Sequence, residues 1–175
     1  MITSFDKYIK EQVGSGIYAS YAGGSGDSVY HFWGNVGAGV LPICIKTKRI
    51  LISYRSKYVD QSNTWGVFGG KIDEEDGEVQ ADVADVARRE FKEETGFDCD
   101  CFELIPSYVY VAPNGNFKYY NFIGLFENEF EPVLDWETEA TKWVTLEELI
   151  KIKPKHFGLI ELLKHDMVNI KKALQ

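Results

Sequence analysis

Three glutamates, Glu90, Glu93 and Glu94, give this chain its clearest chemical signal. On a helix they lie at i, i+3 and i+4, so their carboxylates share one face. Like charges held that close repel one another, and a hard divalent cation such as Mg²⁺ or Mn²⁺ relieves the repulsion because it prefers oxygen ligands. The spacing therefore predicts a metal site. Arg89 can balance part of the charge, and Gly96 is a typical residue to end the helix.

The residues around these glutamates resemble the Nudix box. Segment 89–97 matches the second half of the box, Arg-Glu-apolar-x-Glu-Glu-x-Gly-apolar, at every fixed position. Upstream, segment 65–73 is similar to the strand and Gly-Gly turn that open the box, and Gly77-Glu78 is similar to its Gly-Glu step. The box is longer than the family pattern on both sides of Glu78. The chain thus resembles a MutT-like Nudix hydrolase with a lengthened box.

The resemblance implies a metal-dependent enzyme that hydrolyses a pyrophosphate bond in a nucleoside diphosphate linked to another group. Glu90 and Glu94 are the expected metal ligands, with Glu93 as a further ligand or as the base that orients the attacking water. The backbone carbonyl of Gly69 is another expected ligand, because glycine lets the main chain approach an ion closely. Residues expected to orient or shape the box are Arg89, Gly70, Glu78 and Gly96.

Relatives often add a carboxylate from a loop well after the box, as a metal ligand or a general base. Glu139 is preferred here as the catalytic residue, and Glu137 is the second candidate, also as a substrate contact. The alternatives are Asp135 and the pair Glu127 and Glu129, and a solvated acidic loop remains open for all of them.

Substrate contacts are expected from Arg55, at the end of a strand, and from Phe68. Pro113 follows Phe97 at the spacing that accompanies ADP-ribose pyrophosphatases in the family, which favours ADP-ribose or an ADP-sugar. Pro113 also begins a Pro-Asn-Gly-Asn turn, where a proline needs no functional reason. Nucleoside triphosphates, dinucleoside polyphosphates, a non-catalytic nucleotide sensor and mRNA decapping are the alternatives. Other candidates to stack on a base are Tyr108, Tyr110, Tyr119 and Tyr120.

Composition restricts the partners. The 175 residues carry a formal net charge of −8, which disfavours nucleic acid as a partner because phosphate backbones bind basic surfaces. The N-terminus lacks the apolar centre of a signal peptide, and no segment is apolar enough for a membrane span. Cys44, Cys99 and Cys101 form no disulfide framework and suggest core packing. A reduced, cytoplasmic protein with a nucleotide as substrate is predicted.

The apolar periodicity predicts an α+β fold, and the resemblance implies an α/β/α sandwich with a mixed central sheet. Residues 1–36 are expected to form an N-terminal hairpin extension packed on the domain, and residues 37–175 the Nudix domain. The resemblance leaves three roles open for the extension: homodimer formation, substrate recognition and simple packing. Strands are expected over 39–45, 50–55, 103–112 and 117–126 and up to Val144, with helices over 79–95 and 157–173. Thr145 and Glu148 form a capping box for a short helix between them.

Overall fold

The computed structural model describes residues 36–71, 83–99, 101–113 and 117–175. The predicted N-terminal hairpin and Glu78 lie outside these residues. The strands are β1 (Val36–Cys44), β2 (Arg49–Arg55), β3 (Trp65–Gly66), β4 (Phe68–Lys71), β5 (Glu103–Val111), β6 (Lys118–Phe126) and β7 (Thr138–Val144). The helices are α4 (Val83–Thr95), α5 (Leu146–Lys151) and α6 (Phe157–Ala173).

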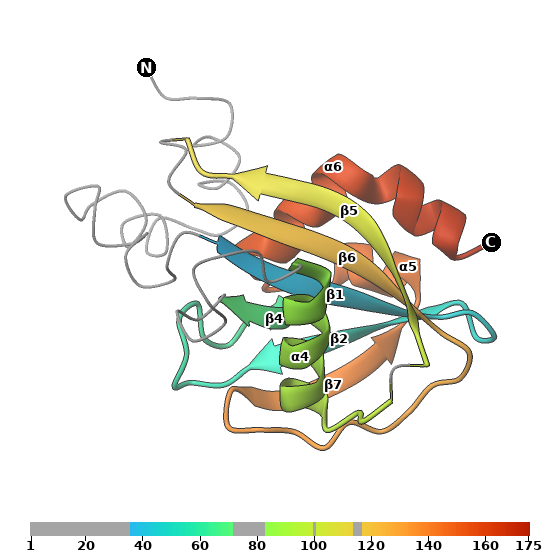
Figure 1. Cartoon of the computed structure of the whole chain (residues 1–175), viewed down its shortest axis with the longest axis horizontal. Coiled ribbons are helices and arrows are strands. Elements are labelled where there is room, and N and C mark those ends of the chain that lie inside the picture. Colours follow the sequence, from blue (N-terminus) through green and yellow to red (C-terminus); the bar gives the residue numbers. More distant parts are fainter. Residues whose placement is uncertain (1–35, 72–82, 100, 114–116) are drawn as a thin grey trace.

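Strand β1 organises the sheet (Figure 1). It runs parallel to β6 along its whole length and antiparallel to two other strands, β4 at its beginning and β2 at its end. Strand β5 pairs with β6, and β3 and β7 pair with β2, all antiparallel. The sheet is therefore mixed, as predicted. Because β1 changes partner along its length, β4 brings its glycines beside the first half of β1.

The sheet has an apolar core on each face. Val86, Ala87 and Phe91 of α4 pack on one face with Ala38 and Phe68. On the other face, α5 and α6 contribute Leu149, Leu159, Leu162 and Ile170 to a cluster with Leu41, Ile43 and Ile52. Alternate residues of β1 thus point to opposite faces, as strand geometry requires. The helices on both sides make the predicted α/β/α sandwich (Figure 1).

Several local predictions are confirmed. The Thr145 hydroxyl accepts from the Glu148 N–H while the Glu148 carboxylate accepts from the Thr145 N–H, so the capping box of α5 is present. Helix α6 has the predicted bounds. Gly96 ends α4 at φ 63°, and its N–H donates to the Lys92 carbonyl at 2.8 Å.

Two local predictions are wrong. Gly69 and Gly70 belong to strand β4, paired with Gly39 and Ala38, and do not form a turn. Cys99 and Cys101 are joined by a disulfide, and Cys101 is exposed rather than packed in the core. Cys44 is a free, buried cysteine, as expected. No helix among the described residues is long and apolar enough to cross a membrane.

Candidate active site

Helix α4 is fixed against the sheet by one aromatic residue. The Phe91 ring is fully buried and lies 5.5 Å from the Phe68 ring and 5.3 Å from the Phe102 ring, centroid to centroid. Phe91 therefore fixes the rotation of the helix about its axis. As a result, Glu90 and Glu94 face strand β4. Phe68 is itself fully buried. We therefore do not retain its side chain as a substrate contact.

Glu94 lies directly against the backbone of Gly69. Its Oε1 accepts a hydrogen bond from the Gly69 N–H at 2.7 Å, and the residue is only 8% exposed. Gly69 has φ 149°, and a β-carbon there would be within 2.4 Å of the Gly39 Cα. Only glycine fits this position, so the close approach of helix and strand depends on it.

Glu90 lies on the next glycine. A β-carbon built on Gly70 would collide with the Glu90 carboxylate. Arg89 holds that carboxylate through Nη2, 2.9 Å from Glu90 Oε1, and reaches Glu93 Oε2 through Nη1 at 3.2 Å. The Glu93 side chain is 58% exposed. The structure thus brings Glu90 and Glu94 to the Gly69–Gly70 backbone and leaves Glu93 on the outer side of Arg89.

Arg55 contributes a positive charge to the surroundings of Glu94. It ends β2, and its Nε donates to the Asp60 carbonyl at 3.0 Å. Burial raises the pKa of Glu94 well above its usual value, while the Gly69 N–H and the Arg55 charge lower it. Asp135 and Glu137 raise it further. Four charged groups from β2, α4 and the loop before β7 therefore share one electrostatic environment.

The loop before β7 delivers Glu137 to the site. The Glu137 carbonyl accepts from the Ser56 N–H at 2.8 Å, and Asp135 Oδ1 accepts from the Glu137 N–H at 3.0 Å, so the loop is tied to the end of β2. Glu137 is half-buried, and burial raises its pKa, Asp135 raises it further and Arg55 opposes the shift. Glu139 is exposed on β7. The structure therefore brings Glu137, rather than the preferred Glu139, to the other carboxylates.

Tyr119 has a position that the sequence reasoning missed. For Tyr119, the sequence predicts only a ring that could stack on a base. Its ring lies where β-carbons of Gly37 and Gly39 would be, and its hydroxyl would be 2.6 Å from a β-carbon on Gly69. Burial and then the Glu94 charge raise the pKa of Tyr119. The Gly-x-Gly pattern of β1 was the signal, since glycines at alternate positions of a strand leave room for a neighbouring ring.

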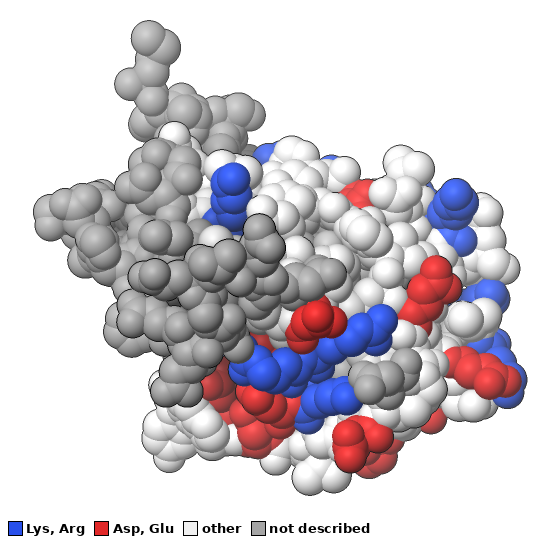
Figure 2. Space-filling model, in the orientation of Figure 1, with Lys and Arg blue, Asp and Glu red and all other residues white. Residues whose placement is uncertain are grey.

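The donor atoms fit a hard divalent cation in kind. Within the described ranges, no three acidic, histidine or cysteine side chains lie close enough together to form a complete metal site. Glu90 and Glu94 still bring carboxylate oxygens to adjacent glycines, Gly70 and Gly69, and a nearby cation would offset the raised pKa of Glu94. Acidic side chains lie beside basic ones on this face of the molecule, over α4 (Figure 2).

The fold and this site define a class of protein, a Nudix-type domain with an acidic helix packed on a glycine-rich strand. The NUDIX domain family matches residues 34–165, and the chain belongs to this family. The predicted enzyme class, a hydrolase acting on pyrophosphate bonds, is confirmed with it. No curated protein sequence matches the chain.

Solved structures share the fold at low sequence identity. RenU, a Nudix hydrolase from M. smegmatis, superposes with a TM-score of 0.63 at 17% identity, over 79% of this chain and 86% of that one. A MutT NUDIX hydrolase from Burkholderia pseudomallei gives 0.55 at 22% identity, over 75% and 96%. The NUDIX domain of Shewanella oneidensis NrtR, complexed with ADP ribose, gives 0.57 at 16% identity, over 83% and 94%.

Proposed function

We propose that this protein hydrolyses the pyrophosphate bond of a nucleoside diphosphate linked to another group, with ADP-ribose or an ADP-sugar favoured as substrate. One observation carries the proposal. Glu90 and Glu94 converge on the backbone of Gly69 and Gly70, with the Arg55 charge beside them. This arrangement joins carboxylate oxygens that hold a cation to a guanidinium that binds phosphate.

Mg²⁺ or Mn²⁺ is the cofactor in this proposal. Its ligands would be Glu90, Glu94 and the Gly69 carbonyl, and when bound it would neutralise phosphate charge and favour ionisation of the attacking water. Arg89 keeps the Glu90 carboxylate over Gly70 through the 2.9 Å ion pair. Arg89 also forms an ion pair with Glu93. Glu93 would become a metal ligand by exchanging this ion pair for the cation.

We assign the general base to Glu137 in preference to Glu139. A general base works best when its pKa lies near the operating pH, and burial raises the pKa of Glu137 in that direction. Arg55 lies close enough to both Glu94 and Glu137 to shift their pKa values. We therefore expect it to bind a phosphate between the helix glutamates and the base. Asp135 positions Glu137 through its backbone N–H.

The nucleobase would contact exposed aromatic rings near the same loops. Trp136 is 65% exposed and Tyr58 is 72% exposed. The Ser56–Glu137 hydrogen bond joins the two loops that carry them. A base stacks well on such rings, at about 1–3 kcal/mol for each base. The Pro113 spacing and the similarity to an ADP-ribose-binding domain favour an adenine nucleotide.

Product analysis tests the proposal. ADP-ribose, ADP-glucose, diadenosine polyphosphates, NADH and (d)NTPs would be incubated with the protein in Mg²⁺ or Mn²⁺. We expect AMP and a sugar phosphate from ADP-ribose, and loss of turnover in Glu94→Gln with the fold intact. Exposed Glu103 supplies the matched variant, Glu103→Gln, which should remain active. A preference for triphosphates would reassign the substrate. Nucleotide binding without product in the wild-type protein would overturn the hydrolase proposal in favour of a sensor.

The remaining sequence predictions concern binding partners, oligomeric state and location in the cell. A small-molecule nucleotide is the proposed partner, without nucleic acid. A homodimer and a cytoplasmic location remain predictions.

A further inference from the structure

The Cys99–Cys101 pair lies on the loop between α4 and β5, apart from the carboxylates described above. The two cysteines are joined by a disulfide at a sequence separation of 2. A cross-link that closes so small a loop removes little freedom from the unfolded chain, so it adds little to stability. A structural role therefore explains this bond poorly, and a chemical role has to be considered.

Exposure makes the pair accessible to reagents. Cys101 is exposed and Cys99 is half-buried, whereas Cys44 is buried in β1. Exposed disulfides tend to be the labile, regulatory or catalytic ones. The backbone N–H of Cys101 donates to Cys99 Sγ at 3.1 Å. This donor would stabilise a thiolate on Cys99 when the bond is reduced.

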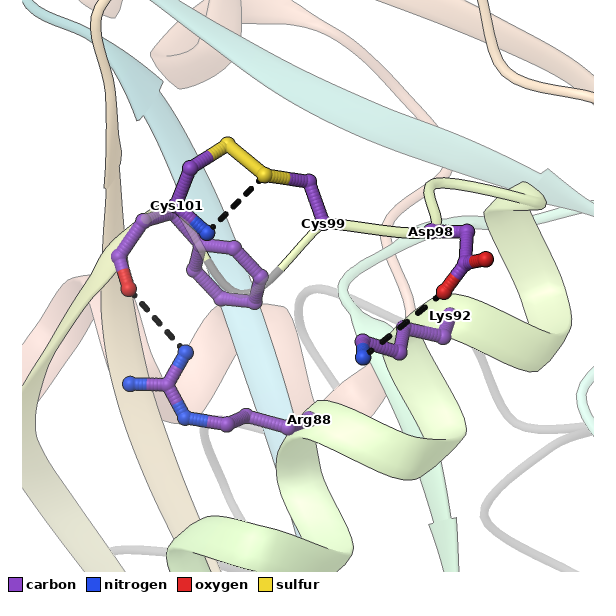
Figure 3. The surroundings of a disulfide bond; sticks show 6 residues. Arg88, Lys92, Asp98, Cys99 and Cys101 are labelled. Atoms are coloured by element: carbon purple, nitrogen blue, oxygen red, sulfur yellow. Dashed lines mark hydrogen bonds and ion pairs between the residues drawn. A yellow bond between two sulfur atoms is a disulfide. The ribbon is translucent and has the colours of Figure 1, made fainter.

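Cations of α4 lie beside the pair (Figure 3). Arg88 Nη1 donates to the carbonyl of Phe102, the residue after Cys101, at 3.0 Å, and its guanidinium lies 4.8 Å from the centre of the Phe102 ring. Lys92 Nζ lies 4.0 Å from Oδ1 of Asp98, the residue before Cys99. Both side chains are therefore held next to the loop, where their charge favours the thiolate form.

The same cations line a surface hollow of about 440 Å³ on α4. Its lining residues are Asp85, Arg88, Arg89, Lys92 and Glu93. Arg88 and Lys92 belong to both the hollow and the surroundings of the disulfide. A small anionic molecule in the hollow would contact Arg88 and Lys92, which also bind the residues on either side of the cysteine pair.

We propose that Cys99 and Cys101 form a redox site that exchanges with anionic low-molecular-weight disulfides and thiols. In the oxidising direction, the Cys101 thiolate attacks one sulfur of the small disulfide. That S–S bond breaks, and the first small thiolate leaves. Cys99, as a thiolate, then attacks Cys101 Sγ and releases the second. The protein loses two electrons and two protons, and the small disulfide becomes two thiols.

The test uses the full-length protein, reduced and freed of reductant, with glutathione disulfide as the anionic probe and hydroxyethyl disulfide as the neutral one. Mass spectrometry of the intact protein should show the loss of two hydrogen atoms in the wild type. In Cys99→Ser the reaction should stop at a mixed disulfide on Cys101, because the resolving thiolate is missing. Cys44→Ser should behave as the wild type.

Lys92→Gln tests the role of the cations. It should slow the reaction with glutathione disulfide several-fold more than the reaction with hydroxyethyl disulfide. Lys171→Gln makes the same charge change on an exposed residue of α6 and should alter neither rate. The proposal is overturned if the wild-type thiols stay reduced in excess glutathione disulfide, or if Lys92→Gln slows both reagents equally.

Discussion

The carboxylate of Glu90 rests on the backbone of Gly70, in the space that a β-carbon would occupy. Helix α4 and strand β4 can approach this closely only because the residue is glycine. The contact explains why a Gly-Gly pair precedes an acidic helix in this chain, and it gives the first prediction.

Gly70→Ala should impair the proposed hydrolysis while the protein still folds. The added methyl group displaces the Glu90 carboxylate from its position beside Arg89. A misplacement of about 1 Å at a catalytic site can cost on the order of 10²-fold in rate. We expect a loss of this size in kcat/KM and a higher metal requirement, measured with Mn²⁺ titrations. Far-UV circular dichroism controls for folding, and an unchanged metal requirement would count against Glu90 as a ligand.

Glu137→Gln and Glu139→Gln separate the two candidates for the distal base. Glu137 shares the environment of Arg55 and Glu94, and removing a general base costs about 10²–10⁴-fold. We expect that loss in kcat for Glu137→Gln and little change for Glu139→Gln. The acid limb of the pH–rate profile reports the base, which must be deprotonated to work, and this limb should change in Glu137→Gln. The opposite ranking of the two variants would restore the preference for Glu139.

Trp136→Ala should weaken substrate binding more than it slows turnover. If the ring stacks on the base, its loss costs about 1–3 kcal/mol, equivalent to a KM raised by about 5-fold to 150-fold. Trp136→Phe should recover much of the loss because it keeps an aromatic face. Steady-state kinetics on the best substrate measure both values. An unchanged KM, together with a change of oligomeric state in Trp136→Ala, would assign the ring to a contact between two copies of the chain.

Because of His156, we expect the protein to become less stable as the pH falls. Burial, and then the Arg55 charge, lower its pKa well below the usual 6.5. The unfolded chain therefore binds this proton at a higher pH than the folded protein. The free energy of unfolding should fall as the pH drops below about 6.5, by up to about 1.4 kcal/mol for each pH unit until the folded pKa is reached.

Denaturant unfolding at several pH values measures this effect. His156 Nδ1 accepts from the Gly158 N–H at the start of α6. His156→Asn keeps an acceptor at this position but cannot titrate, so its stability should depend less on pH. His165 of α6, whose side chain is 40% exposed, supplies the control variant His165→Asn. If His156→Asn shows the same acid-side loss as the wild type, another group is responsible.

Local chemistry in the sequence was enough to predict most of the elements. Thr145 and Glu148 predicted the start of α5, and Gly96 predicted the end of α4. The spacing of apolar residues predicted the bounds of α6. These features depend on interactions between neighbours in the chain, and a sequence displays them directly. The metal-ligand spacing of the glutamates is of the same kind.

The tertiary structure alone decided which of these residues meet. Phe68 turned out to be core because Phe91 packs on it, and Glu93 turned outward because the helix rotation gives the buried face to Glu94. Glu137, and not Glu139, lies near Glu94 and Arg55 because the loop before β7 is tied to Ser56, far away in the sequence. Such contacts depend on how distant segments pack together. The sequence therefore determined the family and the reactive groups, and packing between distant segments determined their arrangement.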